Sequence, residues 1–295
     1  MAAGDTITQS LADSLPTVIA SARQIREQEG VVPNLVDKVT LGEGAGLSWN
    51  EVSMAALTAQ TVTETTRLDN PQQMSDTLLT ITPTVVGIHT LITDRVAARI
   101  SKNAYAKVGG LAQNAIQRKK DEDGLTAIDG ASLTIGGSGS ALTTGMIAAA
   151  VSRISSDSDE PGNPPYRAVL HGFQIKDLYD AVASISSGNP PTESGYTDGL
   201  AARVFQEGFR GRIHNCEIYE DGNISTAGNA AKGGIFAQEA LILVQGRSPR
   251  TETRREPHIG GGSTSVFLYD EYAYGERSPG NWLFEVETDA TLPTT

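Results

Sequence analysis

Residues 81–100, ITPTVVGIHTLITDRVAARI, place two different periodicities next to each other. The first half is rich in threonine, valine and isoleucine, which are typical of β-strands. The second half begins with Thr93 and Asp94, and a threonine followed by an acidic residue is a typical helix start. Val96 and Ile100 then begin an apolar stripe at helical spacing. The stretch therefore predicts a strand that leads directly into a helix.

The segment before this junction predicts a long β-hairpin. Residues 57–68 (LTAQTVTETTRL) and 77–92 (TLLTITPTVVGIHTLI) both have strand composition, and residues 69–76 (DNPQQMSD) carry an Asn-Pro turn signal between them. An isolated hairpin is barely stable in water, so one that projects needs a partner surface.

The segment after the junction predicts the longest helix of the chain, from Asp94 to Glu122, with lysines in its last turn. Its length would be roughly 43 Å at 1.5 Å per residue. The stripe expected to face the core consists of Val96, Ile100, Ala104, Val108, Leu111 and Ala115. The glycine pair at 109–110 weakens the middle of the helix, so a bend or a close helix crossing is expected there.

The remaining chain alternates helix and strand patterns. Helices are expected at 143–156 and 173–186, a buried strand at 166–172, a strand-turn-strand segment at 207–224 and a strand-rich end at 263–290. Residues 156–166 form a polar, proline-rich break, and residues 187–200 predict a long mobile loop. Residues 1–46 have weak order signals and predict an arm that becomes ordered by lying across another surface.

Residues 230–244, AAKGGIFAQEALILV, raise the question of a phosphate site, because a glycine pair precedes an apolar run. A P-loop fails because Lys232 precedes the glycines instead of following them, and no G-x-G-x-x-G opens the segment. We therefore expect a turn at 233–234 followed by a packing helix over 235–244. The expected apolar stripe of that helix is Phe236, Ala240 and Leu243.

Composition describes an ordinary globular protein of 295 residues, large enough for one or two domains. The net charge of -12 argues against tight, nonspecific binding of phosphate backbones. Cys216 is the one cysteine, so no internal disulfide can form and a reducing compartment is expected. We expect no signal peptide, because the first sixteen residues lack a basic and an apolar region, and no apolar run suggests a membrane helix.

No residue pattern predicts catalysis, a cofactor or a metal. The histidines are widely spaced and are expected at surface or edge positions: His89, His171, His214 and His258. His214 and Cys216 form an isolated H-x-C pair, G-x-S-x-G is absent, and the acidic turn at 157–160 lacks the spacing of a calcium loop.

One segment is locally basic. Residues 247–257, RSPRTETRREP, carry Arg247, Arg250, Arg254 and Arg255, and Lys232 is near in sequence. Glutamates at 252 and 256 alternate with these arginines. The alternation favours ion pairs between subunits over tracking of a phosphate backbone.

The order of these elements resembles the major capsid protein of tailed bacteriophages, an α+β fold shared with herpesvirus capsid floors and encapsulins. Residues 81–100 resemble the family's return from an extended loop into a spine helix, and residues 212–224 resemble a strand pair of its axial lobe. Residues 230–257, followed by a glycine-rich break and 263–276, resemble the last helix of that lobe and the strands that return from it. The resemblance implies an N-terminal arm (1–46), an extended loop (47–86), a peripheral domain (87–165 and 246–290) and an axial domain (166–245).

The same resemblance implies a structural subunit, not an enzyme. Hexamers and pentamers of the chain would form an icosahedral shell around the double-stranded DNA of a tailed phage, assembled in the host bacterial cytoplasm without a membrane or a cofactor. Because the chain starts almost directly at the arm, we expect either a separate scaffolding protein or a scaffolding segment that has already been removed. A decoration protein and a portal are further candidate partners. Expected inter-subunit contact residues are Arg67, Asp69, Asn70, Arg250, Arg254 and Arg255. The alternatives are an encapsulin compartment or, from another class, a soluble α/β enzyme.

Some relatives lock their shells by joining a lysine of the extended loop to an asparagine of another subunit. Between Val39 and Ser101 this sequence has no lysine. We therefore expect a shell held by noncovalent contacts, although Cys216 leaves one pairwise bridge between subunits open.

Overall fold

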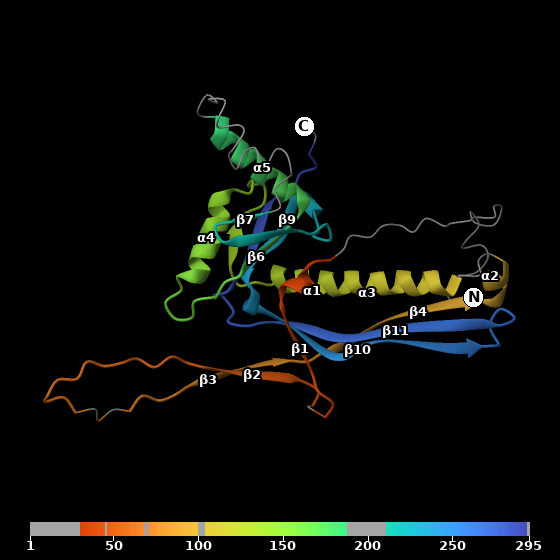
Figure 1. The fold of residues 1–295 in the computed structure, drawn as a ribbon, viewed down its shortest axis with the longest axis horizontal. Helices are drawn as coiled ribbons and strands as arrows, with labels where there is room; N and C mark the ends of the chain where they lie inside the picture. The colour runs from red at the N-terminus through yellow and green to blue at the C-terminus, as the bar shows by residue number, and fades with distance from the viewer. Residues whose placement is uncertain are drawn as a thin grey trace.

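The computed structural model describes residues 30–44, 46–67, 69, 71–99, 104–187 and 211–293, and Figure 1 shows their arrangement. A four-stranded sheet has the order β1-β10-β11-β4, and a six-stranded sheet has the order β5-β12-β9-β6-β8-β7. A separate pair, β2-β3, projects away from both as a thin hairpin. The molecule is therefore a mixed α and β fold with one long, exposed extension.

The helices are α1 (Val32–Leu35), α2 (Asp94–Arg99), α3 (Ala104–Asp129), α4 (Thr144–Ser155) and α5 (Gly172–Ser187). The first six strands are β1 (Asp37–Thr40), β2 (Trp49–Met54), β3 (Asp76–Ile81), β4 (Thr84–Thr93), β5 (Thr134–Gly136) and β6 (Tyr166–Leu170). The last six are β7 (Arg212–Ile213), β8 (Cys216–Glu220), β9 (Ala230–Ala237), β10 (Leu241–Glu256), β11 (Ser263–Glu276) and β12 (Leu283–Asp289). These bounds confirm the helices predicted at 143–156 and 173–186 and the strands predicted at 166–172 and 263–290. Of the strand-turn-strand segment predicted at 207–224, residues 211–224 are described, and they contain β7 and β8.

Helix α3 lies along one face of the long β10-β11-β4 sheet (Figure 1). The Nζ atom of Lys120 is 2.7 Å from Oδ2 of Asp270 in β11, and both side chains are buried. Tyr272, two residues further along β11, donates a 2.8 Å hydrogen bond from its hydroxyl to Asp123 of α3. A buried ion pair gives positional specificity because its loss leaves an unpaired charge, so these contacts fix the helix on the sheet.

The six-stranded sheet carries α4 and α5 and forms the other lobe. Its core includes Ile147 and Ile154 of α4, Leu178 of α5 and Phe284 of β12, all fully or almost fully buried. Buried Gln174 of α5 donates from Nε2 to the Ala231 carbonyl (3.0 Å) and to the Thr288 hydroxyl (2.7 Å). Because a buried amide must find partners, this side chain aligns α5 with β9 and β12.

The prediction of a turn and a helix at 233–244 is wrong, because residues 230–237 are a strand at the centre of the six-stranded sheet. A Cβ atom at Gly233 would lie 2.4 Å from the Val169 carbonyl oxygen, and one at Gly234 would lie 2.3 Å from Cγ2 of Ile128. The glycines are therefore needed for close approach of β6 and α3, and they do not form a turn. The chain then crosses from one sheet to the other through a short 3₁₀ segment, Gln238–Ala240, into β10.

A long helix is present where the sequence predicts one, but its end and its buried residues differ from the prediction. Thr93 caps α2 by accepting from the Val96 amide (3.4 Å), as expected, but α3 ends at Asp129 instead of Glu122. The glycine pair at 109–110 lies inside α3. The predicted stripe is also displaced: Leu111 is 40% exposed, and the residues that face the sheet are Ala112, Ile116 and Lys120. Ile100 lies outside the described residues. Within the described part of α3, the face that packs on the sheet is made of other residues than the predicted stripe.

Two further predictions need correction. The first hairpin strand is β2 at 49–54 and not residues 57–68, which lie beyond it in the loop. Residues 30–44 of the predicted arm pack against the body of their own chain. Val32 and Val36 are buried there, and β1 pairs in parallel with β10. Residues 1–29 and the loop predicted at 187–200 fall almost wholly outside the described residues. The predicted domain boundaries stay a prediction, although the six-stranded sheet also draws on β5 and β12.

Candidate assembly interface

The projecting β2–β3 hairpin has two unlike faces. In its antiparallel register Trp49 lies opposite Ile81 and Val52 lies opposite Leu78. Trp49 and Ile81 pack in a small apolar cluster at the root, against β10. On the other face Val52, Leu78 and Met54 are 52%, 61% and 69% exposed. Contiguous apolar surface of this kind marks an interaction site, since a hairpin cannot bury it alone.

The root of the hairpin is anchored by Arg277, which follows β11. Its Nε atom donates to Glu51 of β2 and its Nη1 atom donates to Asp37 of β1, both at 2.7 Å. The guanidinium also lies 5.9 Å from the ring centre of Trp49. The planar guanidinium of Arg277 therefore holds both the hairpin and β1 in place at the root, because it donates a hydrogen bond to each.

The tip of the hairpin, residues 55–75, contains no helix or strand among its described residues. Gln72 accepts a 2.9 Å hydrogen bond from the Thr58 amide across the tip. The large exposed apolar side chains here are Leu57, Val62 and Met74. Of the predicted contact residues, Arg67 and Asp69 are exposed in the tip, and Asn70 lies outside the described residues. The exposed surface of the tip therefore contains both apolar and charged groups.

The predicted contact residues of the basic segment lie on β10, at the opposite end of the molecule from the hairpin tip (Figure 1). Arg250 is 3.5 Å from Glu252 and its guanidinium lies 5.5 Å from the ring centre of Tyr269. Arg254 is 3.1 Å from Glu256. These contacts lie within the chain, at a strongly exposed surface where ion pairs add little stability. The structure thus places the two predicted groups of contact residues apart.

Arg255 points to the other face of β10, toward the start of α2. It forms a two-pronged ion pair with Asp94, with 2.5 Å between Nη1 and Oδ1. The hydrogen bond from Arg255 lowers the pKa of the Asp94 carboxyl. Arg255 therefore ties β10 to the spine within one subunit.

A buried pair of acidic residues holds the beginning of the described chain, and no local sequence signal identifies it. Asp121 of α3 accepts from the Val32 amide (3.0 Å) and from the Asn223 side chain (2.9 Å). Asp221, after β8, lies beside it and accepts weakly from the Val31 amide (3.5 Å). Burial, together with the neighbouring Asp221 charge, raises the pKa of Asp121 to about 7. The Asp121 carboxyl therefore keeps its proton to a higher pH than an exposed aspartate does.

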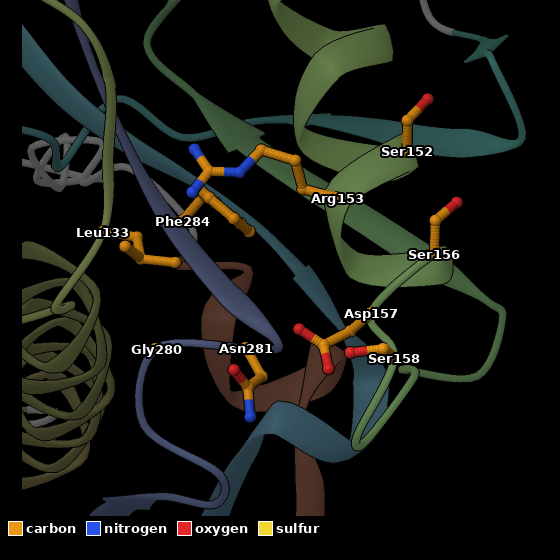
Figure 2. Close-up of a pocket in the computed structure, with 9 residues that line it drawn as sticks. All are labelled: Leu133, Ser152, Arg153, Ser156, Asp157, Ser158, Gly280, Asn281 and Phe284. Carbon is orange, nitrogen blue, oxygen red and sulfur yellow. The ribbon is translucent and has the colours of Figure 1, made fainter.

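Figure 2 shows a surface pocket beside the end of α4, in which the Arg153 side chain extends toward Phe284. Asp157 accepts hydrogen bonds from the Asp159 and Glu160 amides, at 2.9 and 3.1 Å, and these bonds lower its pKa. The acidic residue at this pocket thus caps its own turn, as expected of the 157–160 segment. Within the described ranges, no cluster of three or more His, Cys, Asp or Glu is placed to hold a metal.

Comparison with solved structures decides the fold. No family model matches the chain, and no curated protein matches it in sequence. The capsid asymmetric unit of cyanophage Pam1 is similar over 99% of this chain and 100% of that chain, with a TM-score of 0.74 and 10% identity. The head structure of Helicobacter pylori bacteriophage KHP40 is similar over 96% and 98%, with a TM-score of 0.72 and 11% identity. This chain has the phage capsid fold.

A third structure, the mature capsid of bacteriophage PhiM1, gives a TM-score of 0.66 at 15% identity over 95% of this chain and 93% of that chain. The fold predicted from the order of elements is therefore confirmed. Among the described residues, the hairpin tip and the far end of β10 are both exposed. No helix in the described part of the chain is long and apolar enough to cross a membrane.

Proposed function

We propose that this chain is the shell subunit of a tailed-phage head, with a structural and not a catalytic role. Copies of the chain form hexamers and pentamers that close into an icosahedral shell around double-stranded DNA. The observation that carries the proposal is the hairpin: in a chain with the capsid fold, it presents Val52, Met54 and Leu78 to solvent. A partner surface would cover this face.

The net charge of -12 fits a container that encloses nucleic acid without gripping it. A separate scaffolding protein, a decoration protein and a portal belong to the same proposal, as does assembly in the host cytoplasm. The encapsulin alternative is not favoured, because the similar structures are phage heads and capsids. A soluble α/β enzyme would have little use for an apolar, projecting hairpin.

The experiment changes the exposed face of the hairpin without changing its core. Val52→Thr with Leu78→Thr keeps two residues of high strand propensity and removes two exposed apolar side chains. Each lost contact would weaken an interface by about 1–2 kcal/mol, so we expect folded subunits that no longer form particles in electron micrographs. The matched control is the exchange Ser53→Thr with Thr77→Ser, a directly opposed pair on the other face, which should assemble normally. Normal shells from the first variant would contradict the proposed role of this face.

A further inference from the structure

The far half of β10 is a strand with one open edge. β11 pairs with β10 along one side up to Glu256, whereas β1 pairs with the other side only from Ile242 to Gln245. Beyond Gln245, no described strand covers that side, and residues 247–255 are all exposed. Figure 1 shows the same open border along this end of the sheet. Unpaired amides and carbonyls on such an edge are a template for another strand.

We call residues 250–256 of this strand the distal edge. Read from residue 256 to residue 250, the signs of its alternate charged side chains are the opposite of those read from 250 to 256. Arg250, Glu252, Arg254 and Glu256 alternate in sign at every second residue and therefore share one face of the strand. The centre of the series is Thr253. Arg255 belongs to the opposite face, where it binds Asp94.

Two prolines delimit this series. Pro249 and Pro257 stand directly before and after the distal edge, and neither has an amide hydrogen to donate to a ladder. A strand that pairs here can therefore extend over the seven residues between them and no further without interruption. The middle of that interval is again Thr253.

We propose that the distal edge pairs antiparallel with the distal edge of a second copy of this chain, about a two-fold axis at Thr253. In this register Arg250 lies opposite Glu256 of the partner subunit, and Glu252 lies opposite Arg254 of the partner subunit. The axis repeats each pair, so four opposite-charge pairs form across one contact. The contact is isologous, as a two-fold interface requires.

Neighbouring registers are disfavoured by the same charges. Moving the axis to residue 252 places Arg250 opposite the partner's Arg254, and moving it to residue 254 places Glu252 opposite the partner's Glu256. Like charges directly opposite each other destabilise an antiparallel pair. The charge order therefore selects one register, in which the β10-β11-β4 strands of two copies form a continuous sheet.

The exposed ion pairs within the chain do not oppose this arrangement. The side chains of Arg250, Glu252 and Arg254 are 54%, 56% and 73% exposed, so their present contacts are weak and can be exchanged. The side chain of Glu256 is only 12% exposed. Its carboxylate is therefore held in place, and it can accept a contact from Arg250 of the partner subunit.

A cysteine on the axis tests the register. In Thr253→Cys the two new thiols face each other, so mild oxidation should give a disulfide-linked dimer on a non-reducing gel. Thr251→Cys is the matched control, because it lies on the same strand but opposite Arg255 of the partner subunit. The two new thiols would then be four residues apart along the paired strands. We expect at least about tenfold more dimer from Thr253→Cys than from Thr251→Cys, which corresponds to about 1.4 kcal/mol. Equal yields, or no dimer from Thr253→Cys, would overturn the inference.

Charge exchange tests the complementarity in the Thr253→Cys background. Glu252→Arg alone, or Arg254→Glu alone, places like charges opposite each other twice per contact and should reduce the dimer yield several-fold. Combining both substitutions restores opposite charges and should restore the yield. A double variant as poor as the single variants, or single variants without effect, would show that charge order does not set the pairing.

The inference rests on the proposed function only in that copies of the chain must meet, and the two can fail separately. If the Thr253→Cys protein forms particles but no disulfide-linked dimer, the proposed strand pairing is wrong and the shell role is unaffected. A link between copies in a protein that never forms particles would support the pairing and count against the shell role.

Discussion

The Nε atom of Arg277 donates a 2.7 Å hydrogen bond to Oε2 of Glu51, across 226 residues of sequence. The same guanidinium donates to Asp37, so three separate parts of the chain meet at one half-buried cation. The direction of the hairpin is therefore set at its root and not by contacts along its length.

Replacing Arg277 should loosen the hairpin before it unfolds the lobes. Arg277→Met keeps the apolar stem and leaves two acidic side chains without their cation. We expect the free energy of unfolding to fall by about 1–3 kcal/mol and amide exchange in residues 49–54 and 76–81 to accelerate. Arg277→Lys, which keeps the charge but not the planar fork, should lie between wild type and Met. Unchanged exchange in both variants would show that the root is held by other contacts.

The glycines of β9 give a stability prediction with an internal control. Gly233→Ala brings a Cβ atom to 2.4 Å from a backbone oxygen that cannot move aside. We expect a loss of about 1–3 kcal/mol in denaturant unfolding. Gly137→Ala, whose Cβ atom would have nothing within 4 Å, should change stability by less than about 0.5 kcal/mol. Equal effects at the two positions would mean that the close approach at Gly233 is not required.

The same strand shows where sequence reasoning ends. Phe236, Ala240 and Leu243 recur at helical spacing, but 230–237 is a strand buried on both faces, and a short apolar run of this kind cannot be told from a helix by period alone. What decides it is pairing with β12 and β6, which are distant in sequence. The signal that was available is the glycine pair itself, which marks close backbone approach as readily as a turn.

Other elements were predictable because their signals are local. The Thr93 cap and the Thr143 cap each accept a hydrogen bond from an amide three residues later. The strand at 166–170 is a short run, apolar except for Arg167, with turn signals beside it. The anchoring of the hairpin by Arg277 and the meeting of Asp121 with Asp221 involve groups about 100 or more residues apart. No periodicity or spacing contains that information, so these parts of the candidate interface required the structure.

The Asp121–Asp221 pair predicts a pH dependence. The folded pKa of Asp121, about 7, lies above its ordinary value of 3.8, so the folded chain binds more protons than the unfolded chain between these limits. The contribution of this group to stability is therefore present at low pH and is lost as pH rises toward 7, by at most about 1.4 kcal/mol per pH unit. The neighbouring titratable groups are Asp221 and Tyr274.

Asp221→Asn isolates this effect, because its amide can donate to the Asp121 carboxylate and removes the neighbouring charge. We expect the pH slope of urea unfolding between pH 5 and 7 to become less negative than in wild type. Glu64→Gln, an exposed change in the hairpin tip, serves as the control. If the slopes of wild type and Asp221→Asn coincide, the Asp221 charge does not raise the pKa of Asp121.

The absence of lysine from Val39 to Ser101 predicts shells without covalent links through the hairpin. Cys216 is buried, and burial raises the pKa of its thiol to about 12, which disfavours a disulfide to another subunit. Mature particles boiled in denaturing detergent with reductant should run as one band near 31.1 kDa. A ladder of covalent multimers under these conditions would contradict the prediction.

The most direct test of the shell role is negative-stain electron microscopy of the purified wild-type chain, with gel filtration of the same sample. We expect large particles with shell walls of regular subunit spacing, which elute in the void volume, and a fraction that grows with protein concentration. A chain that stays a monomer or small oligomer at every concentration, with no particles in the micrographs, would contradict the proposal that it builds a phage head.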